Sequence, residues 1–153
     1  AGKPALKFYD ASNTNGYLVD KNGQWSAAAA NEYMVTALTS YSEASNNMIE
    51  LVICNNDGMA EGAVSALSGA GYNNGSGKSI PVFGVDATAA AINLIKSGNM
   101  AGTIKQDADG MASAIAKLAS NVTEGKDLMA DTDDLNIDED VAKIRIPYSK
   151  YLG

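Results

Sequence analysis

The sequence predicts an α/β fold with an open, mostly parallel, doubly wound sheet. The first observation is a run of apolar and β-branched residues, 49–54, that stops at two amides, a carboxylate and a glycine. Apolar residues at helical spacing follow this run through Leu67, as expected of a buried strand that leads into a helix. The second observation is that two more strand-then-helix segments come later in the chain. Strands that alternate with helices form parallel sheets, and this alternation sets the predicted fold class.

The segment that precedes the central strand is predicted to contain a strand, a long loop and a helix. Residues 4–9 alternate between apolar and polar side chains, which indicates a strand. Residues 11–24 are rich in Asn, Gly, Asp and Ser and indicate a loop, in which 20–23 offers too few oxygen ligands for calcium and is predicted to be a plain turn. Ser26 is a suitable N-cap for a helix over 27–41 with one apolar face.

The segment after the central strand and its helix repeats the alternation. The predicted elements are a glycine-rich turn over 68–79, a strand over 80–85, a helix over 87–96, a strand over 100–105, a helix ending near Gly125, and a last strand over 143–148. Residues 131–140 carry six carboxylates without the glycine of a calcium loop, and they predict a solvated connection.

Composition excludes several classes of function. The net charge of −7 disfavours nucleic acid and anionic membrane surfaces as partners. The chain has no histidine, so neutral-pH acid–base chemistry and metal binding lack their commonest side chain. The single cysteine, Cys54, lies within the apolar strand and is predicted to be a buried small hydrophobe, not a nucleophile. No apolar stretch is long enough to span a bilayer.

Polar side chains stand at the ends of three successive predicted strands. They are Asn56 with Asp57, Asp86, and Gln106 with Asp107. Each one alone is equally typical of a helix cap, because amides and carboxylates accept hydrogen bonds from the first turn of a helix. However, parallel strands joined by right-handed crossovers bring their ends to one edge of the sheet, where ligands of α/β proteins bind. Together these residues predict a ligand site.

The chemistry of these residues predicts a neutral polyol as the ligand. An amide both donates and accepts, and a carboxylate accepts two hydroxyl protons, whereas an anionic ligand needs cations and only Lys105 is near. Trp25, the only tryptophan, directly precedes the predicted N-cap. It is either a hydrophobic staple that closes the helix entry or a flat platform for a sugar ring or a base.

Catalysis is poorly supported by the sequence. There is no nucleophile beside a base, no histidine and no cluster of metal ligands. The remaining catalytic alternative is a pair of carboxylates for glycoside cleavage, Asp57 and Asp86, but acids at strand ends recur in binding proteins. The sequence therefore predicts a binding protein and no enzyme.

Several segments, in this order and spacing, resemble the periplasmic sugar-binding proteins of ABC importers, and among these the glucose/galactose-binding proteins. The similar segments are residues 49–63, 80–87, 95–98, 101–103 and 143–148. The resemblance runs from about Lys3 to Tyr148, and the loop over 12–23 looks like an insertion.

The resemblance implies roles for five residues. Asn56 and Asp86 would bind sugar hydroxyls and Trp25 would stack on one face of the ring. Gln106 lies where the glucose/galactose binders usually have asparagine and the related ribose binders have glutamine, which leaves both hexose and pentose open. Glu50 matches a glutamate that completes a calcium site in the family, so the resemblance implies calcium as an optional metal of the intact protein. The rest of that calcium loop is not in this sequence.

The resemblance also implies a domain organisation. Residues 1–106 would form the C-terminal sugar-binding lobe without its first strand, 107–140 would cross the hinge and pack a helix on the other lobe, and 141–153 would return as a strand and tail. The chain is then expected to be the C-terminal half of a two-lobed protein. We expect the missing N-terminal half, or a strand-exchanged second copy, to complete its sheet.

The implied function is reception of a monosaccharide, most simply glucose or galactose, by closure of two lobes around it. The closed receptor would deliver the sugar to the membrane permease of an ABC importer and also to a chemoreceptor in chemotaxis. It would be periplasmic or extracellular, and lipid-anchored in a Gram-positive bacterium. The alternative from another class is the effector-binding domain of a sugar-responsive transcription regulator, although the sequence has no basic DNA-binding segment.

Overall fold

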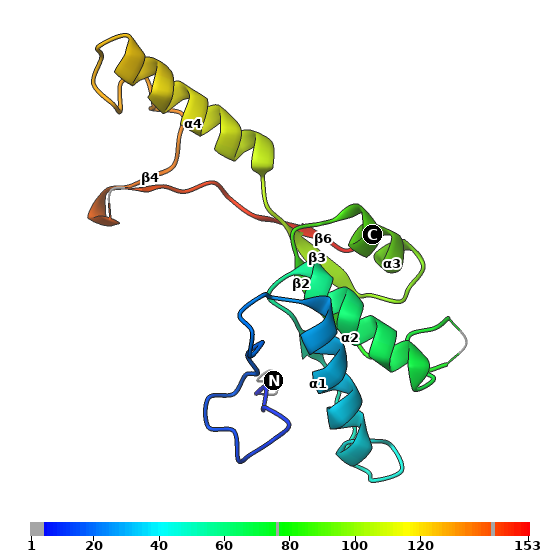
Figure 1. Ribbon diagram of the computed structural model, residues 1–153. Coiled ribbons are helices and arrows are strands. Elements are labelled where there is room, and N and C mark those ends of the chain that lie inside the picture. Colours follow the sequence, from blue (N-terminus) through cyan, green and yellow to red (C-terminus); the bar gives the residue numbers. More distant parts are fainter. Residues whose placement is uncertain (1–4, 76, 142) are drawn as a thin grey trace. The chain divides into compact units, whose positions relative to one another are not determined.

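The computed structural model describes residues 5–75, 77–141 and 143–153, and residues 1–4, 76 and 142 lie outside this description (Figure 1). The chain divides into two compact units. Unit 1 is Ala1–Ile104 together with Tyr151–Gly153, and unit 2 is Lys105–Lys150.

Unit 1 is built on parallel strands connected by helices. Its elements are α1 (Ala27–Ser40), β1 (Val52–Ile53), α2 (Asp57–Gly69), β2 (Val82–Val85), α3 (Ala89–Lys96) and β3 (Gly102–Lys105), of which only the last residue of β3 falls in unit 2. The strand order is β1-β2-β3-β6, where β6 is Ser149–Tyr151, and β2 pairs in parallel with both β1 and β3. The predicted α/β class with an open, mostly parallel sheet is confirmed.

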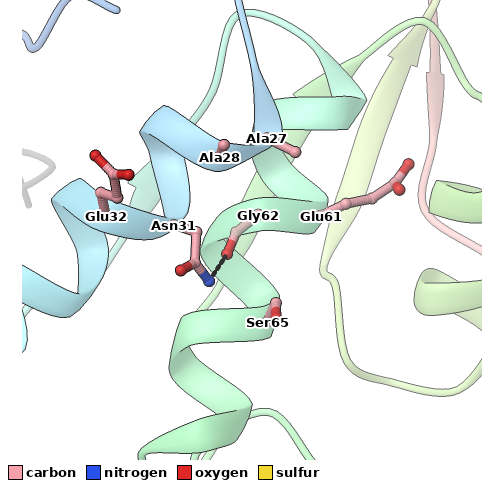
Figure 2. Close-up of a pocket in the computed structure, with 7 residues that line it drawn as sticks. All are labelled: Ala27, Ala28, Asn31, Glu32, Glu61, Gly62 and Ser65. Carbon is pink, nitrogen blue, oxygen red and sulfur yellow. Dashed lines mark hydrogen bonds between the residues drawn. The ribbon is translucent and has the colours of Figure 1, made fainter.

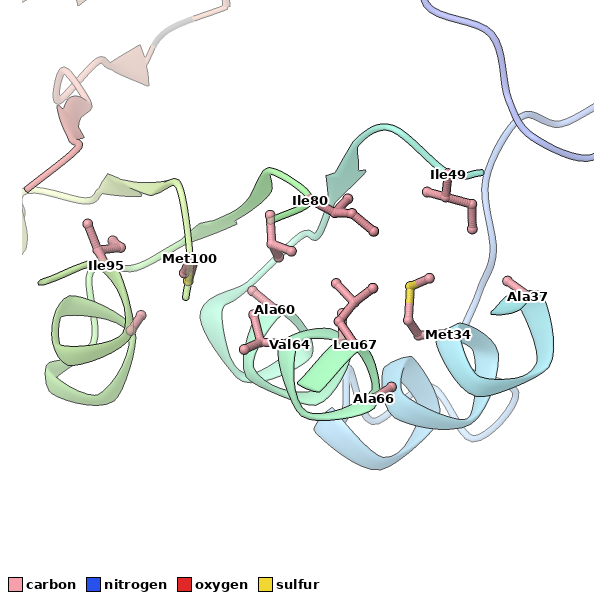
Figure 3. Close-up of a cluster of buried hydrophobic side chains, with 13 residues drawn as sticks. Met34, Ala37, Ile49, Ala60, Val64, Ala66, Leu67, Ile80, Ile95 and Met100 are labelled. Carbon is pink, nitrogen blue, oxygen red and sulfur yellow. The ribbon is translucent and has the colours of Figure 1, made fainter. Parts of the chain in front are cut away.

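The core of unit 1 lies between the sheet and the helices that follow its strands. Leu67 of α2 and Val82 of β2 are fully buried in it, and Leu67 lies in the middle of the cluster (Figure 3). Met34 and Ala37 of α1 add a further buried layer, and Ile95 of α3 closes another side. The helical spacing seen in the sequence therefore marks the faces that enter this core.

Helices α1 and α2 pack closely because Gly62 has no side chain. A Cβ at Gly62 would overlap the carbonyl oxygen of Ala27. The Nδ2 of Asn31 donates to the carbonyl oxygen of Gly62 at 3.0 Å, which joins the two helices at the same level. This crossing fixes the start of α1 against α2, and the ends of both helices carry predicted site residues.

Two strand predictions in unit 1 need correction. The predicted strand over 4–9 is wrong for 5–9, which form no strand, and Pro4 lies outside the described residues. Alternation alone makes no strand, because the backbone also needs a neighbouring strand to pair with. The central strand is shorter than predicted, only Val52–Ile53, and Ile53 is 67% exposed. β1 is an edge strand that pairs only with β2 among the described strands, so its burial is incomplete.

Helix α3 begins two residues later than predicted. Asp86 and Ala87 have φ values of +118° and +56°, which no right-handed helix contains. Thr88 is the N-cap instead, and its hydroxyl oxygen accepts from the backbone N–H of Ala91 at 3.2 Å. Residues 86–88 thus form a short non-helical connection between β2 and α3.

Unit 2 contains α4 (Ala108–Thr123), β4 (Ile137–Asp138), a 3-10 helix (Glu139–Val141) and β5 (Lys143–Ile144). The predicted helix end near Gly125 is confirmed, since Gly125 has φ +70° just past the C-cap. The acidic stretch 131–140 is more than a connection, because its β4 pairs antiparallel with β5.

The single strand predicted over 143–148 is also wrong. Pro147 lacks the N–H that a continuous ladder needs, and β6 begins only at Ser149.

Candidate functional site

Asn56 joins the start of α2 to the residue before α1. Its Oδ1 accepts from the backbone N–H of Met59 at 2.7 Å, which confirms the alternative that Asn56 caps α2. Its Nδ2 donates to the carbonyl oxygen of Trp25 at 3.1 Å. The structure therefore brings Asn56 and Trp25 together. An amide has two donor hydrogens and two acceptor lone pairs, so capping is compatible with binding a ligand.

Trp25 stands on the surface at the entry to α1. It is 57% exposed and has φ +52°, directly before the N-cap Ser26. A hydrophobic staple would bury the ring against the first turns of the helix. The exposure of the indole therefore favours the platform alternative.

Asp20 holds the loop that presents Trp25, a role that was not predicted from the sequence. Its Oδ2 accepts from the backbone N–H and from the hydroxyl of Ser26, at 3.1 and 2.8 Å. Its Oδ1 accepts from the backbone N–H of Asn22 at 2.8 Å. The Asn22 N–H, and next the Ser26 hydroxyl, lower the pKa of the Asp20 carboxyl. The predicted plain turn is confirmed by the bond from Gly23 N to Asp20 O. The Asp-x-Asn-Gly pattern signalled that turn but not the link to Ser26.

Asp57 is fully buried, unlike the ligand or catalytic residue that the sequence allowed. Its Oδ1 accepts from the Thr103 hydroxyl at 2.6 Å, and its Oδ2 accepts from the backbone N–H of Thr88 at 2.7 Å. A carboxylate with no exposed surface and both oxygens in use is unsuited to attack a glycoside. The alternative of a catalytic pair of Asp57 and Asp86 is therefore not supported.

Asp86 is exposed at the end of β2, where the backbone leaves the sheet in an unusual conformation. Its N–H donates to the carbonyl oxygen of Ile104 at 2.8 Å, and the N–H of Ala87 donates to the Thr103 hydroxyl at 3.4 Å. Both residues have positive φ, which L-residues adopt only when their surroundings require it. The connection that carries Asp86 is thus tied to β3.

Gln106 directly follows β3 and belongs to unit 2. It is half-buried, and its carbonyl oxygen accepts from the N–H of Ala108 at 3.1 Å. Its neighbours Lys105 and Asp107 line a shallow hollow of about 350 Å³ with residues 147–149 of the same unit. The role of Gln106 as a fourth ligand residue stays a prediction.

A shallow pocket of about 460 Å³ lies between α1 and α2 (Figure 2). Its lining consists of Ala27, Ala28, Asn31, Glu32, Glu61, Gly62 and Ser65. None of the predicted ligand residues lines it. The pocket is the groove of the close helix crossing at Gly62, and the carboxylates of Glu32 and Glu61 point away from each other. The predicted ligand residues at the strand ends therefore lie outside this groove.

Neither Glu50 nor Cys54 forms a reactive or metal centre by itself. Glu50 is exposed, and no group of three or more His, Cys, Asp or Glu side chains suited to a metal is found in the described part of the chain. The described residues alone therefore do not make a calcium site.

Burial raises the pKa of the Cys54 thiol to about 11, and its side chain packs against the core. Cys54 is thus a small hydrophobe at the edge of the core, and it is half-buried where full burial was predicted.

None of the helices in the described part of the chain combines the length and the apolar character that a bilayer crossing requires.

Comparison with known proteins gives consistent relatives. A family model described as "Periplasmic binding protein domain" matches residues 4–127. The chain is 42% identical over 104 residues to the D-galactose/methyl-galactoside binding periplasmic protein MglB of Haemophilus influenzae, a match that covers 68% of this chain and 29% of the relative. It is 35% identical over 108 residues to the D-xylose-binding periplasmic protein of Escherichia coli, covering 71% and 30%.

Solved structures agree with these relatives. An ABC transporter solute binding protein of Bacillus halodurans with bound myo-inositol matches with a TM-score of 0.61 and 29% identity, over 84% of this chain and 37% of that one. A periplasmic solute binding protein of Actinobacillus succinogenes with bound D-allose matches with a TM-score of 0.55 and 30% identity, over 67% and 34%. The chain thus spans about 30% of the length of the first two curated relatives. These relatives are binding proteins, which confirms the prediction of a protein without enzymatic function. Because the family model covers most of the sequence, the chain belongs to the periplasmic binding protein family, as its motifs predicted.

Proposed function

We propose that the chain forms one face of a monosaccharide site in the periplasmic receptor of an ABC importer. The observation that carries this proposal is the bond from the Asn56 amide to the Trp25 backbone. It holds the backbone of Trp25, whose side chain is exposed, against a strand-end amide 31 residues later in the sequence. Asp57, the next residue, holds the backbone at Thr88, just past the exposed Asp86. Three chemically suitable side chains are therefore presented by linked connections.

The roles of these side chains follow from their chemistry. The Asp86 carboxylate accepts from two neighbouring sugar hydroxyls, and the Asn56 amide donates to one hydroxyl and accepts from another. The Trp25 indole covers the apolar C–H face of the ring. Gln106 is the proposed fourth residue and contacts a hydroxyl through its amide.

The proposed sugar is galactose or glucose. Its support is the 42% identity to a relative named for D-galactose and methyl-galactoside binding. A pentose is the second candidate, because another relative is named for D-xylose and because Gln106 replaces the asparagine usual in glucose/galactose binders. A glutamine side chain is one methylene longer than asparagine, so its amide reaches further. Position 106 is therefore the proposed determinant of whether a hexose or a pentose binds.

The proposed partners are a second lobe outside this sequence, the membrane permease and a chemoreceptor, and the proposed location of the receptor is the periplasm. Exposed apolar side chains of unit 2 support the second lobe. Ile115 and Val122 of α4 are 68% and 61% exposed, and Leu128 is 50% exposed. Apolar side chains at such spacing are usually buried by a neighbour. Glu50 is the proposed contribution of this chain to a calcium site that other residues of the intact protein complete.

Calorimetric titration of the intact protein with galactose, glucose, xylose and ribose tests this proposal. We expect saturable heat with galactose or glucose and weaker binding of the pentoses. In the same titration Asp86→Ala should lose affinity. Its matched control is Asp133→Ala, which removes an exposed carboxylate of unit 2 and should bind as the wild type does. Absence of binding heat with all four sugars would contradict the proposed function.

A further inference from the structure

We propose that the buried Asp57 is a positioning residue that sets the conformation of the connection carrying Asp86. It touches no ligand itself. The effect on sugar affinity rests on the proposed function, whereas the effect on the backbone of the connection does not.

The Asp57 carboxylate reaches this connection by two routes. Its Oδ2 accepts directly from the N–H of Thr88, two residues after Asp86, at 2.7 Å. Its Oδ1 accepts from the Thr103 hydroxyl at 2.6 Å, and that hydroxyl oxygen accepts from the N–H of Ala87 at 3.4 Å. Two successive backbone N–H groups are thus held, one directly and one through Thr103.

The conformation that these bonds hold is one that the backbone does not favour by itself. Asp86 and Ala87 have φ values of +118° and +56°. Non-glycine residues stay in such regions only when the surrounding structure over-determines them. The N–H groups of Asp86, Ala87 and Thr88 all have acceptors, and two of the three lead to Asp57. The carboxylate therefore restrains two of the three N–H groups of this connection.

The surroundings of Asp57 are built to admit its carboxylate. Asp57 has no exposed surface, and a Cβ at Gly84 of β2 would overlap its Oδ1. The same Cβ would also lie 3.0 Å from the Cε of Met100. Because a buried hydrogen bond to a carboxylate is strong in low dielectric, this arrangement is rigid. Asn56 beside it holds the backbone of Trp25, so one dipeptide restrains the two connections that carry Trp25 and Asp86.

Thr103 offers the cleanest variants for a test in the intact protein. Thr103→Val keeps the shape of the side chain and removes the hydroxyl, whereas Thr103→Ser keeps the hydroxyl. The readouts are the affinity for galactose by calorimetry and the hydrogen exchange of the Ala87 and Thr88 amides by NMR. Asp57→Asn is the second variant, for use if Thr103→Val fails to fold. Its side chain has the same shape as that of Asp57 and retains one acceptor oxygen.

We expect Thr103→Val to weaken galactose binding about tenfold and to speed exchange of the Ala87 amide by a similar factor, because the Ala87 N–H loses its acceptor and the buried Asp57 Oδ1 loses its donor. Thr103→Ser should remain within about threefold of the wild type in both readouts. Asp57→Asn should change both readouts in the same direction as Thr103→Val. Amides in the middle of α2 serve as the reference for global opening.

Unchanged exchange at Ala87 in Thr103→Val, or at Thr88 in Asp57→Asn, would overturn the proposal. Lower stability with unchanged affinity in the folded protein would also overturn it, because Asp57 would then be only a structural residue. If the wild type binds none of the sugars, the proposed function fails. The amide exchange still decides whether Asp57 holds the connection.

Discussion

The strand-end region of unit 1 and the helical unit 2 are held together in different ways. In unit 1, side-chain hydrogen bonds join distant parts of the chain, with Asn56 reaching back 31 residues to Trp25 and Asp57 reaching forward 46 residues to Thr103. In unit 2, Asn121 donates to the carbonyl oxygens of Leu128 and Ala130, only seven and nine residues away. Arg145 pairs with Asp138, also seven residues away.

The burial of apolar side chains follows the same division. Unit 1 has a continuous core around Leu67 and Val82. In α4 of unit 2 only Ala114 and Asn121 are buried, while Ile115 and Val122 are exposed. A site built from several connections needs long-range restraints, because no single turn can fix the geometry between them. Unit 2 instead offers exposed apolar side chains that are suited to a partner, so changes in the two units should have different effects.

Asp86→Ala should give the largest functional effect. It removes the only carboxylate among the proposed ligand residues, and we expect sugar affinity to fall at least about 100-fold, since hydrogen bonds to charged groups contribute most. The thermal midpoint should stay within about 2 °C, because Asp86 is exposed. Calorimetry and thermal unfolding measure the two effects. Unaltered affinity would remove Asp86 from the site.

Leu67→Ala and Ile115→Ala should separate the two units in stability. Leu67 is fully buried, so its truncation should lower the free energy of unfolding by about 2–5 kcal/mol. Ile115 is 68% exposed, and its truncation in this chain should change that value by less than about 0.5 kcal/mol. Denaturant unfolding of this chain measures both. Equal losses would show that α4 is as well packed as α2, against the contrast drawn above.

Two glycines of the same helix make a matched pair. Gly62→Ala should destabilise the chain by about 1–3 kcal/mol, because its methyl group would overlap the backbone of Ala27. Gly69→Ala, at the end of α2, meets no atom within 4 Å and should be neutral or stabilising by up to about 1 kcal/mol. Denaturant midpoints measure the difference. A neutral Gly62→Ala variant would contradict the close crossing of α1 and α2.

The Cys54 thiol should give the smallest effect, visible only at high pH. Its pKa is raised by burial from 9.0 to about 11, so the folded state favours the neutral thiol. The stability it contributes is complete below pH 9 and declines as the pH rises toward 11, where the unfolded chain carries the thiolate. The difference in unfolding free energy between wild type and Cys54→Ala should therefore shrink over this range. A constant difference would contradict burial of the thiol.

The local parts of the fold and of the site could be predicted from the sequence. Periodicity located α1 and α2, and strand–helix alternation placed Asn56 and Asp86 at strand ends, because such signals depend on neighbouring residues. The structural role of Asp57 could not be predicted, since its donors Thr88 and Thr103 are 31 and 46 residues away.

The strand predictions failed for a related reason. The alternation over residues 5–9 satisfied the pattern of a strand, but a strand also needs a neighbour, and the sequence pattern does not contain that requirement. Residues 143–148 alternate equally well, yet Pro147 interrupts the pairing and the chain forms two short strands, β5 and β6. Pairing partners, like the donors to Asp57, are set by tertiary structure.

A crystal structure of the intact protein with its bound monosaccharide tests the central claim most directly. The account predicts the sugar ring against the Trp25 indole, with hydroxyl oxygens within about 3.2 Å of the Asn56 amide and the Asp86 carboxylate. A sugar bound elsewhere, with these three side chains in contact with solvent alone, would contradict it.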